Sequence, residues 1–158
     1  HEAGKGVIIV INKWDLIEKE TNTMEKYKKQ VYAKLAYLSY APIIFISALT
    51  GQRVDKIFDM INEVNKQNSQ RVPTGLLNDV LAEAVTITQP PSDKGRRLKV
   101  YYMTQVSIRP PTFVIFVNSK KLKHFSYVRY LENHLRKQFG FKGTPIHMII
   151  RERKSDEK

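Results

Sequence analysis

The chain has 158 residues, no cysteine and a formal net charge of +12. This length is enough for one domain or two small ones, and the lack of cysteine excludes disulfides and thiol catalysis. The most apolar region, Ala36 to Leu49, is interrupted by serine and proline and is shorter than the roughly 18 residues needed to cross a bilayer. We therefore expect no membrane segment. The sequence starts at His1 without a visible signal peptide, which we interpret as a start inside a longer protein.

The charge is divided unevenly along the chain. Residues 1–70 hold 10 Lys/Arg against 8 Asp/Glu, whereas residues 71–158 hold 17 against 7. This difference predicts two modules that meet near Gln70, the second of them attracted to a polyanion. A charge that only serves solubility is the alternative.

The first motif follows a short apolar run. Val7 to Ile11 are all Val or Ile, which is typical of a strand buried on both faces of a parallel sheet, and ligands bind beyond the carboxyl ends of such strands. Asn12-Lys13-Trp14-Asp15 comes directly after it. The Asp15 carboxylate could accept two hydrogen bonds from the N1–H and amino groups of guanine, a donor pair that adenine lacks. The Asn12 amide suits the N7/O6 edge, the Lys13 stem suits the purine face, and Trp14 is the variable position.

A second strand leads to a second loop. Asn22 and Glu25 have the spacing of a capping box, and a helix of about four turns is expected from there to Leu38. Ile43 to Ile46 form the next strand run, which ends in Ser47-Ala48-Leu49. An amphipathic helix over 54–64 follows. Because the order is β-α-β, both loops are expected at the same edge of the sheet.

The sequence of the second module, residues 71–158, predicts a small α+β fold of order α-β-β-α-β. We expect a helix from Thr74 to about Ile87, a loop over 89–95, a hairpin of strands over 98–107 and 113–117, a helix capped by Ser126 and a last strand over 146–150. In the first of these strands, Leu98 and every second residue after it up to Val106 form one face. The residues between them give the other, polar face. The overall fold class is thus α/β followed by α+β.

Basic residues surround the last predicted helix. They are the candidates for RNA phosphate contacts: Lys120, Lys121, Lys123, Arg129, Arg136 and Lys137. Tyr101, Phe116 and Phe141 could stack on bases, although aromatics in alternating strands are more often core.

Gly140-Phe141-Lys142-Gly143 has two interpretations. It matches the G-x-x-G pattern with which KH domains clamp a nucleic-acid backbone. However, it follows the last helix instead of joining two helices, which favours a helix cap at Gly140 and a turn at Gly143. His124, His134 and His147 lack metal-ligand spacing, so no metal site is predicted, and no nucleophile-base set is evident.

Two resemblances follow from these motifs. Asn12-Lys13-Trp14-Asp15 and Ser47-Ala48-Leu49 resemble the fourth and fifth guanine-nucleotide motifs of translation-factor-class GTPases, in which the backbone N–H after the Ser-Ala step contacts guanine O6. The α-β-β-α-β order resembles a bacterial KH-type domain. Together the modules resemble the C-terminal part of the Der, or EngA, family of tandem-domain ribosome-assembly GTPases, a likeness carried by residues 1–6, 12–15, 40–42, 47–50, 77–79, 110–113 and 140–146.

The resemblance implies a bacterial cytoplasmic protein that binds GTP or GDP. It implies as partners ribosomal RNA or the large ribosomal subunit, in whose assembly the family acts, and the protein's own GTPase domains. Neither G-x-x-x-x-G-K-S/T nor D-x-x-G occurs in the sequence, so we expect Mg²⁺ and phosphate contacts to lie outside it and the chain alone not to hydrolyse GTP. Two alternatives remain: an RNA-binding module with a vestigial nucleotide site, and a protein-interaction module whose sheet faces protein.

Overall fold

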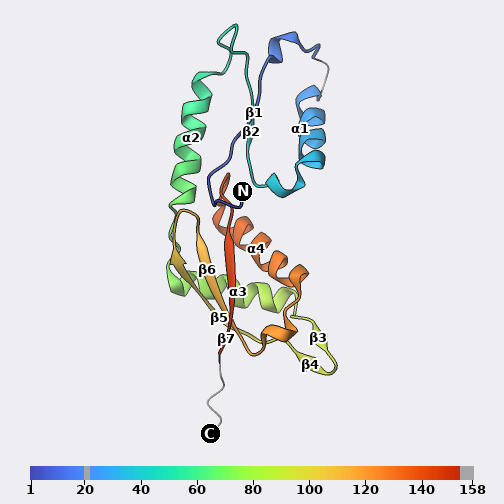
Figure 1. Ribbon diagram of the computed structural model, residues 1–158, viewed down its shortest axis with the longest axis vertical. Coiled ribbons are helices and arrows are strands. Elements are labelled where there is room, and N and C mark those ends of the chain that lie inside the picture. The colour runs from blue at the N-terminus through green and yellow to red at the C-terminus, as the bar shows by residue number, and fades with distance from the viewer. Residues whose placement is uncertain (20–21, 154–158) are drawn as a thin grey trace. The chain divides into compact units, whose positions relative to one another are not determined.

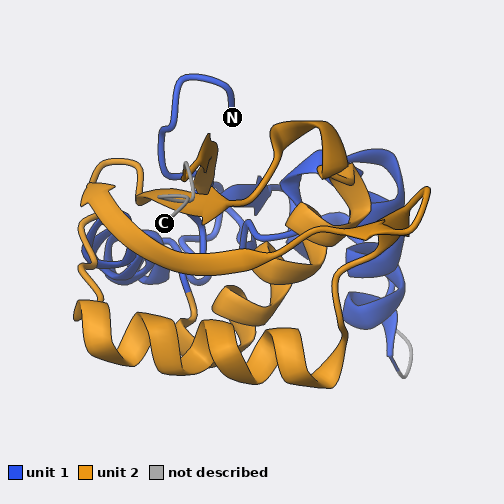
Figure 2. Ribbon diagram, turned by 90° about the horizontal axis from the view of Figure 1, so that it is seen from below, with its two compact units in different colours: residues 1–68, 141–145 blue, residues 69–140, 146–158 orange. Residues whose placement is uncertain are grey.

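The computed structural model describes residues 1–19 and 22–153 and divides the chain into two compact units (Figures 1 and 2). Unit 1 consists of residues 1–68 and 141–145, and unit 2 of residues 69–140 and 146–158. The sequence predicts one boundary near Gln70 and gives no sign that a segment after Gly140 joins the first unit. Among the described helices, none has the length and apolar character needed to cross a bilayer.

Unit 1 contains a two-stranded parallel sheet between two helices (Figure 1). Strand β1 (Ile9–Ile11) pairs with β2 (Ile43–Phe45), so that Ile9 lies opposite Ile43 and Ile11 opposite Phe45. The helices are α1 (Thr23–Lys34) and α2 (Asp55–Asn68), and two short 3-10 helices are η1 (Trp14–Leu16) and η2 (Ala36–Leu38). The β-α-β order predicted from the sequence is confirmed here.

The start of α1 differs from the prediction. Asn22 is the N-cap residue, but it has a left-handed φ of 64° and its side chain makes no capping hydrogen bond. Glu25 instead pairs with Lys28, with 3.3 Å between Oε1 and Nζ. The predicted capping box is therefore wrong, because the left-handed backbone at Asn22 departs from the extended conformation of a capping residue.

Residues 141–145 complete unit 1 at the ends of the strands opposite the predicted loops. The backbone N–H of Val7 donates to the carbonyl of Gly143 at 2.7 Å, and the N–H of Gly143 donates to the carbonyl of Tyr40 at 2.9 Å. Val7 thus pairs with this segment, and β1 is shorter than the five-residue apolar run. Phe141 has no exposed surface.

Unit 2 is a three-stranded sheet with two helices. Strand β5 (Val100–Ser107) pairs antiparallel with β6 (Thr112–Val117), which pairs parallel with β7 (His147–Glu152). Helices α3 (Thr74–Ile87) and α4 (Phe125–Phe139) supply the other layer, and the 3-10 helix η3 (Lys120–Leu122) precedes α4. The core forms between the central strand and the helices; it includes Phe113, Ile115, Leu77, Leu81, Leu131 and Leu135, all at most 4% exposed.

Two details of this unit correct the expectations from the sequence. The expected loop over 89–95 contains half of a small hairpin, formed by β3 (Ser92–Asp93) and β4 (Arg96–Arg97). In β5 the buried residues are Met103 and Gln105, whereas Tyr102 and Val106 are exposed, so the predicted faces are reversed. The cause is the register shift between Val100 and Tyr102, because one extra residue moves every later side chain to the opposite face.

Two side-chain amides hold β5 in place. The Asn78 side chain donates to the carbonyl of Met103 and accepts from its N–H, both at 2.9 Å, and thereby ties α3 to the strand. The Gln105 side chain accepts from the N–H of Val72 at 2.8 Å and donates to the carbonyl of Gln70 at 2.9 Å. Gln105 therefore satisfies backbone groups of the segment that leads into α3, which explains why this polar residue is buried.

Candidate functional site

The two predicted loops lie together at the carboxyl ends of β1 and β2. The Asn12 side-chain oxygen accepts two hydrogen bonds, from the N–H of Lys13 at 2.7 Å and from the N–H of Ala48 at 3.1 Å. One side chain thus joins two loops that are 36 residues apart. Since parallel strands end at the same edge of a sheet, this contact follows from the β-α-β order.

The backbone after each strand is fixed by further hydrogen bonds. Lys13 has a left-handed φ of 59°, which turns the chain sharply after β1, and the N–H of Trp14 then donates to the carbonyl of Ile46 at 3.0 Å. Ser47 is fully buried; its Oγ accepts from the N–H of Thr50 at 3.2 Å, and its N–H donates to the carbonyl of Gln52. Both loops are therefore preorganised by their own chain.

These loops enclose an open cavity of about 420 Å³. It is lined by Asn12, Lys13, Asp15, Leu16, Ser47, Ala48 and Leu49. The Asp15 side chain is partly exposed, while Leu16 and Leu49 are 71% and 89% exposed. These exposed leucine side chains can cover the face of a flat, largely apolar ring. The Asp15 carboxylate beside them can accept hydrogen bonds from the edge of that ring.

Trp14 differs from the rest of the predicted set, because it does not line this cavity. It is only 2% exposed, and its ring packs against Phe45 and Tyr27, with centroids 4.5 and 5.3 Å away. Trp14 thus anchors the loop in the core of unit 1 and does not face a ligand in this cavity. Leu16 is a lining residue that the sequence did not single out; its only signal is its position directly after the Asn-Lys-x-Asp tetrad.

Two backbone N–H groups of the Gly140–Gly143 segment are engaged within unit 1 and are not free to clamp a nucleic acid in the way a KH loop does. The N–H of Phe141 donates to Gln67 Oε1 at 3.0 Å, and that of Gly143 donates to Tyr40. Lys142 forms an ion pair with Glu63 at 3.5 Å, and Asn68 donates to Thr144 Oγ1 at 2.7 Å. Phe141 is likewise too buried to stack on a base.

The basic residues chosen from the sequence do not form one cluster. Lys120, Lys121 and Lys123 are exposed in and after η3. Arg136 and Lys137 lie near the end of α4, roughly 16 Å along the helix axis from Phe125, at 1.5 Å per residue. Arg136 is also partly buried and pairs with Glu132 at 3.3 Å, whereas Arg129 is exposed and its guanidinium lies 4.8 Å from the Phe125 ring centroid.

Comparisons with known proteins match both units of the chain. Residues 71–151 match the family model described as "KH-domain-like of EngA bacterial GTPase enzymes, C-terminal". The chain is 60% identical over 156 residues to GTPase Der of Acetivibrio thermocellus and 61% identical over 153 residues to GTPase Der of Alkaliphilus metalliredigens. These matches cover 99% and 97% of this chain, but only 36% and 35% of the relatives.

The match therefore extends over both units of this chain and over about a third of each relative. The part of the family that it represents is the one that ends in the KH-domain-like domain. The chain belongs to the EngA, or Der, family of bacterial GTPases and corresponds to the C-terminal portion of its members.

Proposed function

We infer that the cavity at the ends of β1 and β2 is the guanine-recognition corner of a GTP-binding domain. The observation that carries this inference is the Asn12 side chain, which accepts hydrogen bonds from Lys13 and Ala48 and so holds both loops around one cavity. In this assignment Asp15 binds the N1–H and amino group of guanine, and the backbone N–H of Leu49 donates to O6. Leu16 and the stem of Lys13 cover the purine.

The phosphate groups and Mg²⁺ of a bound nucleotide are assigned to the part of the longer family members that this chain does not cover. The exposed apolar side chains of α2 support the proposal that unit 1 is one part of a larger GTP-binding domain. Phe58 and Ile61 are 67% and 46% exposed on this amphipathic helix, although Val64 on the same helix is 4% exposed. Within the described residues, the apolar side of α2 is thus only partly covered, as expected if further strands pack against it.

For unit 2, we propose contact with RNA of the large ribosomal subunit, and for the longer protein a role in the assembly of that subunit. The excess of basic residues after residue 70 supports an anionic partner. Contact of the sheet with the protein's own GTPase domains is the second candidate. It is favoured by the exposed apolar side chains of Val106 and Ile149, at 51% and 40% exposed.

Base recognition can be tested on this chain by titrating it with GMP and AMP while backbone amide shifts are followed by NMR. We expect weak binding of GMP, with shifts at residues 12–16 and 47–49, and a response to AMP at least about tenfold weaker, because Asp15 makes two charge-assisted hydrogen bonds to guanine alone. Equal responses to the two nucleotides would refute the assignment.

The Asp15→Asn variant should bind XMP better than GMP, because its amide can donate to the O2 of xanthine. Asp59→Asn is the matched control, since it makes the same change of charge at an exposed position of α2. It should keep the preference for GMP. An Asp15→Asn variant with unchanged preference would show that the carboxylate does not read the base.

A further inference from the structure

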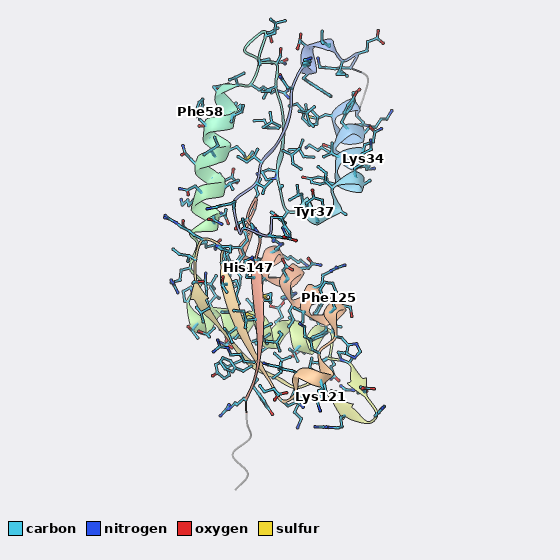
Figure 3. The ribbon with its side chains drawn as sticks, in the orientation of Figure 1. Lys34, Tyr37, Phe58, Lys121, Phe125 and His147 are labelled. Carbon is cyan, nitrogen blue, oxygen red and sulfur yellow. The ribbon has the colours of Figure 1, made fainter. Side chains whose placement is uncertain are left out.

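Exposed basic side chains gather where β5 begins and where β6 and β7 end. The hairpin of β3 and β4 lies beside this end of the sheet, as does the segment before α4 in which Figure 3 labels Lys121 (Figures 1 and 3). We call this region the hairpin-end surface and define it by its nine exposed cations: Lys94, Arg96, Arg97, Lys99, Lys120, Lys121, Lys123, Arg151 and Arg153. Among the described residues of the same segments, Asp93 and Glu152 are the acidic ones.

Hydrogen bonds hold these segments together. The Asn118 side chain accepts from the N–H of Lys99 at 2.9 Å and donates to the carbonyl of Arg97 at 3.1 Å, which joins the hairpin to the end of β6. The Glu152 carboxylate accepts from the N–H of Lys120 at 2.7 Å, which joins η3 to β7. Neutral and acidic side chains thus fix the backbone, and among the exposed cations the Arg97 guanidinium donates to Gln89 Oε1.

The tip of the hairpin places a lysine in an unfavourable conformation. Lys94 and Gly95 both have positive φ, 48° and 78°, and join Asp93 to Arg96 in a two-residue turn. Asn, Asp or Gly is the usual residue at the first of these positions, and a lysine there carries a conformational cost.

The chemistry of this surface favours a phosphate backbone over other anionic partners. A protein partner would require an apolar, charge-poor centre, and a bilayer would require apolar side chains to insert, whereas the hairpin presents Ser92, Asp93, Lys94 and Gly95. Arginine forks fit phosphate oxygens in pairs. In addition, Tyr101 is 42% exposed and has the Arg153 guanidinium 5.8 Å from its ring centroid, which leaves an aromatic surface among the cations for an unpaired base.

We propose that the hairpin-end surface binds the phosphate backbone of RNA, and that it does so in place of the G-x-x-G segment, whose Phe141 and Gly143 N–H groups are engaged inside unit 1. The proposal rests on the RNA contact proposed above and adds its location. It moves the contact to β3 and β4, which the sequence did not single out, and away from Arg136 and Lys137 on α4.

The test compares two variants of the whole chain that each remove two positive charges. The hairpin variant is Lys94→Gln/Arg96→Gln, and the helix variant is Arg129→Gln/Lys137→Gln, whose sites are both exposed on α4. Binding to a labelled oligouridylate and to an RNA duplex is measured over a series of salt concentrations. Each cation that no longer neutralises a phosphate of a single strand lowers the steepness of log K against log salt by about 0.7.

We expect the hairpin variant to flatten this slope by about 1.4, which is twice the value for one phosphate. The helix variant should leave the slope unchanged. Both variants should keep the circular dichroism spectrum of the unmodified chain. Lys94→Arg should keep the slope of the unmodified chain. An unchanged slope in the hairpin variant, or equal flattening in both variants, would overturn the location while leaving the RNA contact intact.

Failure of the unmodified chain to bind either RNA would overturn the proposed RNA contact itself, and the location with it. Comparing the two probes then identifies the ligand further. If the chain binds the oligouridylate more tightly than the duplex, and Tyr101→Ala removes this preference, the ligand is a single strand whose bases stack on Tyr101. Equal binding of the duplex with no effect of Tyr101→Ala would indicate contact with phosphates alone.

Discussion

Replacing Gly143 by alanine tests whether residues 141–145 are an integral part of unit 1. A Cβ at this position would lie 2.4 Å from Cγ2 and 2.9 Å from Cγ1 of Val64, a side chain that is 4% exposed, and the backbone has a φ of 76°. The left-handed conformation should cost about 1–2 kcal/mol for alanine. Overpacking in the core should add about 1–3 kcal/mol. We therefore expect the free energy of unfolding of unit 1 to fall by about 2–5 kcal/mol, the sum of the two effects.

Gly51→Ala is the matched control. Gly51 has nearly the same φ, 77°, and lies in the same unit, but a Cβ there would meet no described atom within 4 Å. Its replacement should cost only the conformational part, about 1–2 kcal/mol. Trp14 is the only tryptophan of the chain and is buried in unit 1, so its fluorescence during urea unfolding reports on this unit.

A double-mutant cycle with Val64→Ala separates packing from strain. In the Val64→Ala background the two Cγ atoms are gone and only the Cβ of residue 64 remains, 3.2 Å away, so Gly143→Ala should cost much less than in the unmodified chain and approach the cost of Gly51→Ala. If Gly143→Ala and Gly51→Ala cost the same in the unmodified chain, the close approach of Gly143 to Val64 is not formed in solution. The integration of residues 141–145 into unit 1 would then be refuted.

Two other predictions concern side chains on which the structure makes a specific statement. Burial, with a smaller contribution from the nearby Tyr130, raises the pKa of Tyr127 to about 12 from its ordinary value of 10.0. The unfolded chain therefore releases this proton near pH 10 while the folded chain keeps it, so the free energy of unfolding should fall as the pH rises from 10 to about 12. Unfolding of Tyr127→Phe should depend less on pH over this range, and an identical dependence would contradict the assignment. Phe58→Ser should leave the stability of unit 1 towards urea within about 0.5 kcal/mol of the unmodified chain, because Phe58 is 67% exposed, and should reduce self-association measured by light scattering. A destabilisation of several kcal/mol would show that Phe58 is covered.

The parts of the fold that depend on local periodicity could be predicted from the sequence. The helix predicted after Thr74 forms over Thr74–Ile87, because its apolar spacing is regular, although its N-cap is Pro73 and not the predicted Thr74. The meeting of Asn12 and Ala48 could also be predicted, since a β-α-β unit brings the ends of both strands to one edge.

The errors arise where long-range contacts override local signals. A single bulge near Tyr101 reverses the faces of β5, and no residue type marks it in the sequence. The turn at Lys94-Gly95 lacks the Asn-Gly or Asp-Gly pair by which such hairpins are usually found. Trp14 belongs to the tetrad in sequence, yet a 3-10 turn directs it into the core and away from the cavity that its neighbours line.

The position of residues 141–145 has a consequence for the order in which the chain folds. During synthesis, residues 1–68 emerge before residues 69–158, yet the partner that satisfies the N–H of Val7 follows 136 residues later (143 − 7). Closing a flexible segment of that length costs on the order of 4 kcal/mol in entropy, from (3/2)RT ln n. Residues 69–140 form part of unit 2, so its folding fixes Gly140 and shortens the search for the first unit. We therefore expect the N-terminal unit to mature last, against the direction of translation, and refolding followed by Trp14 fluorescence to lag behind the folding of the sheet in unit 2.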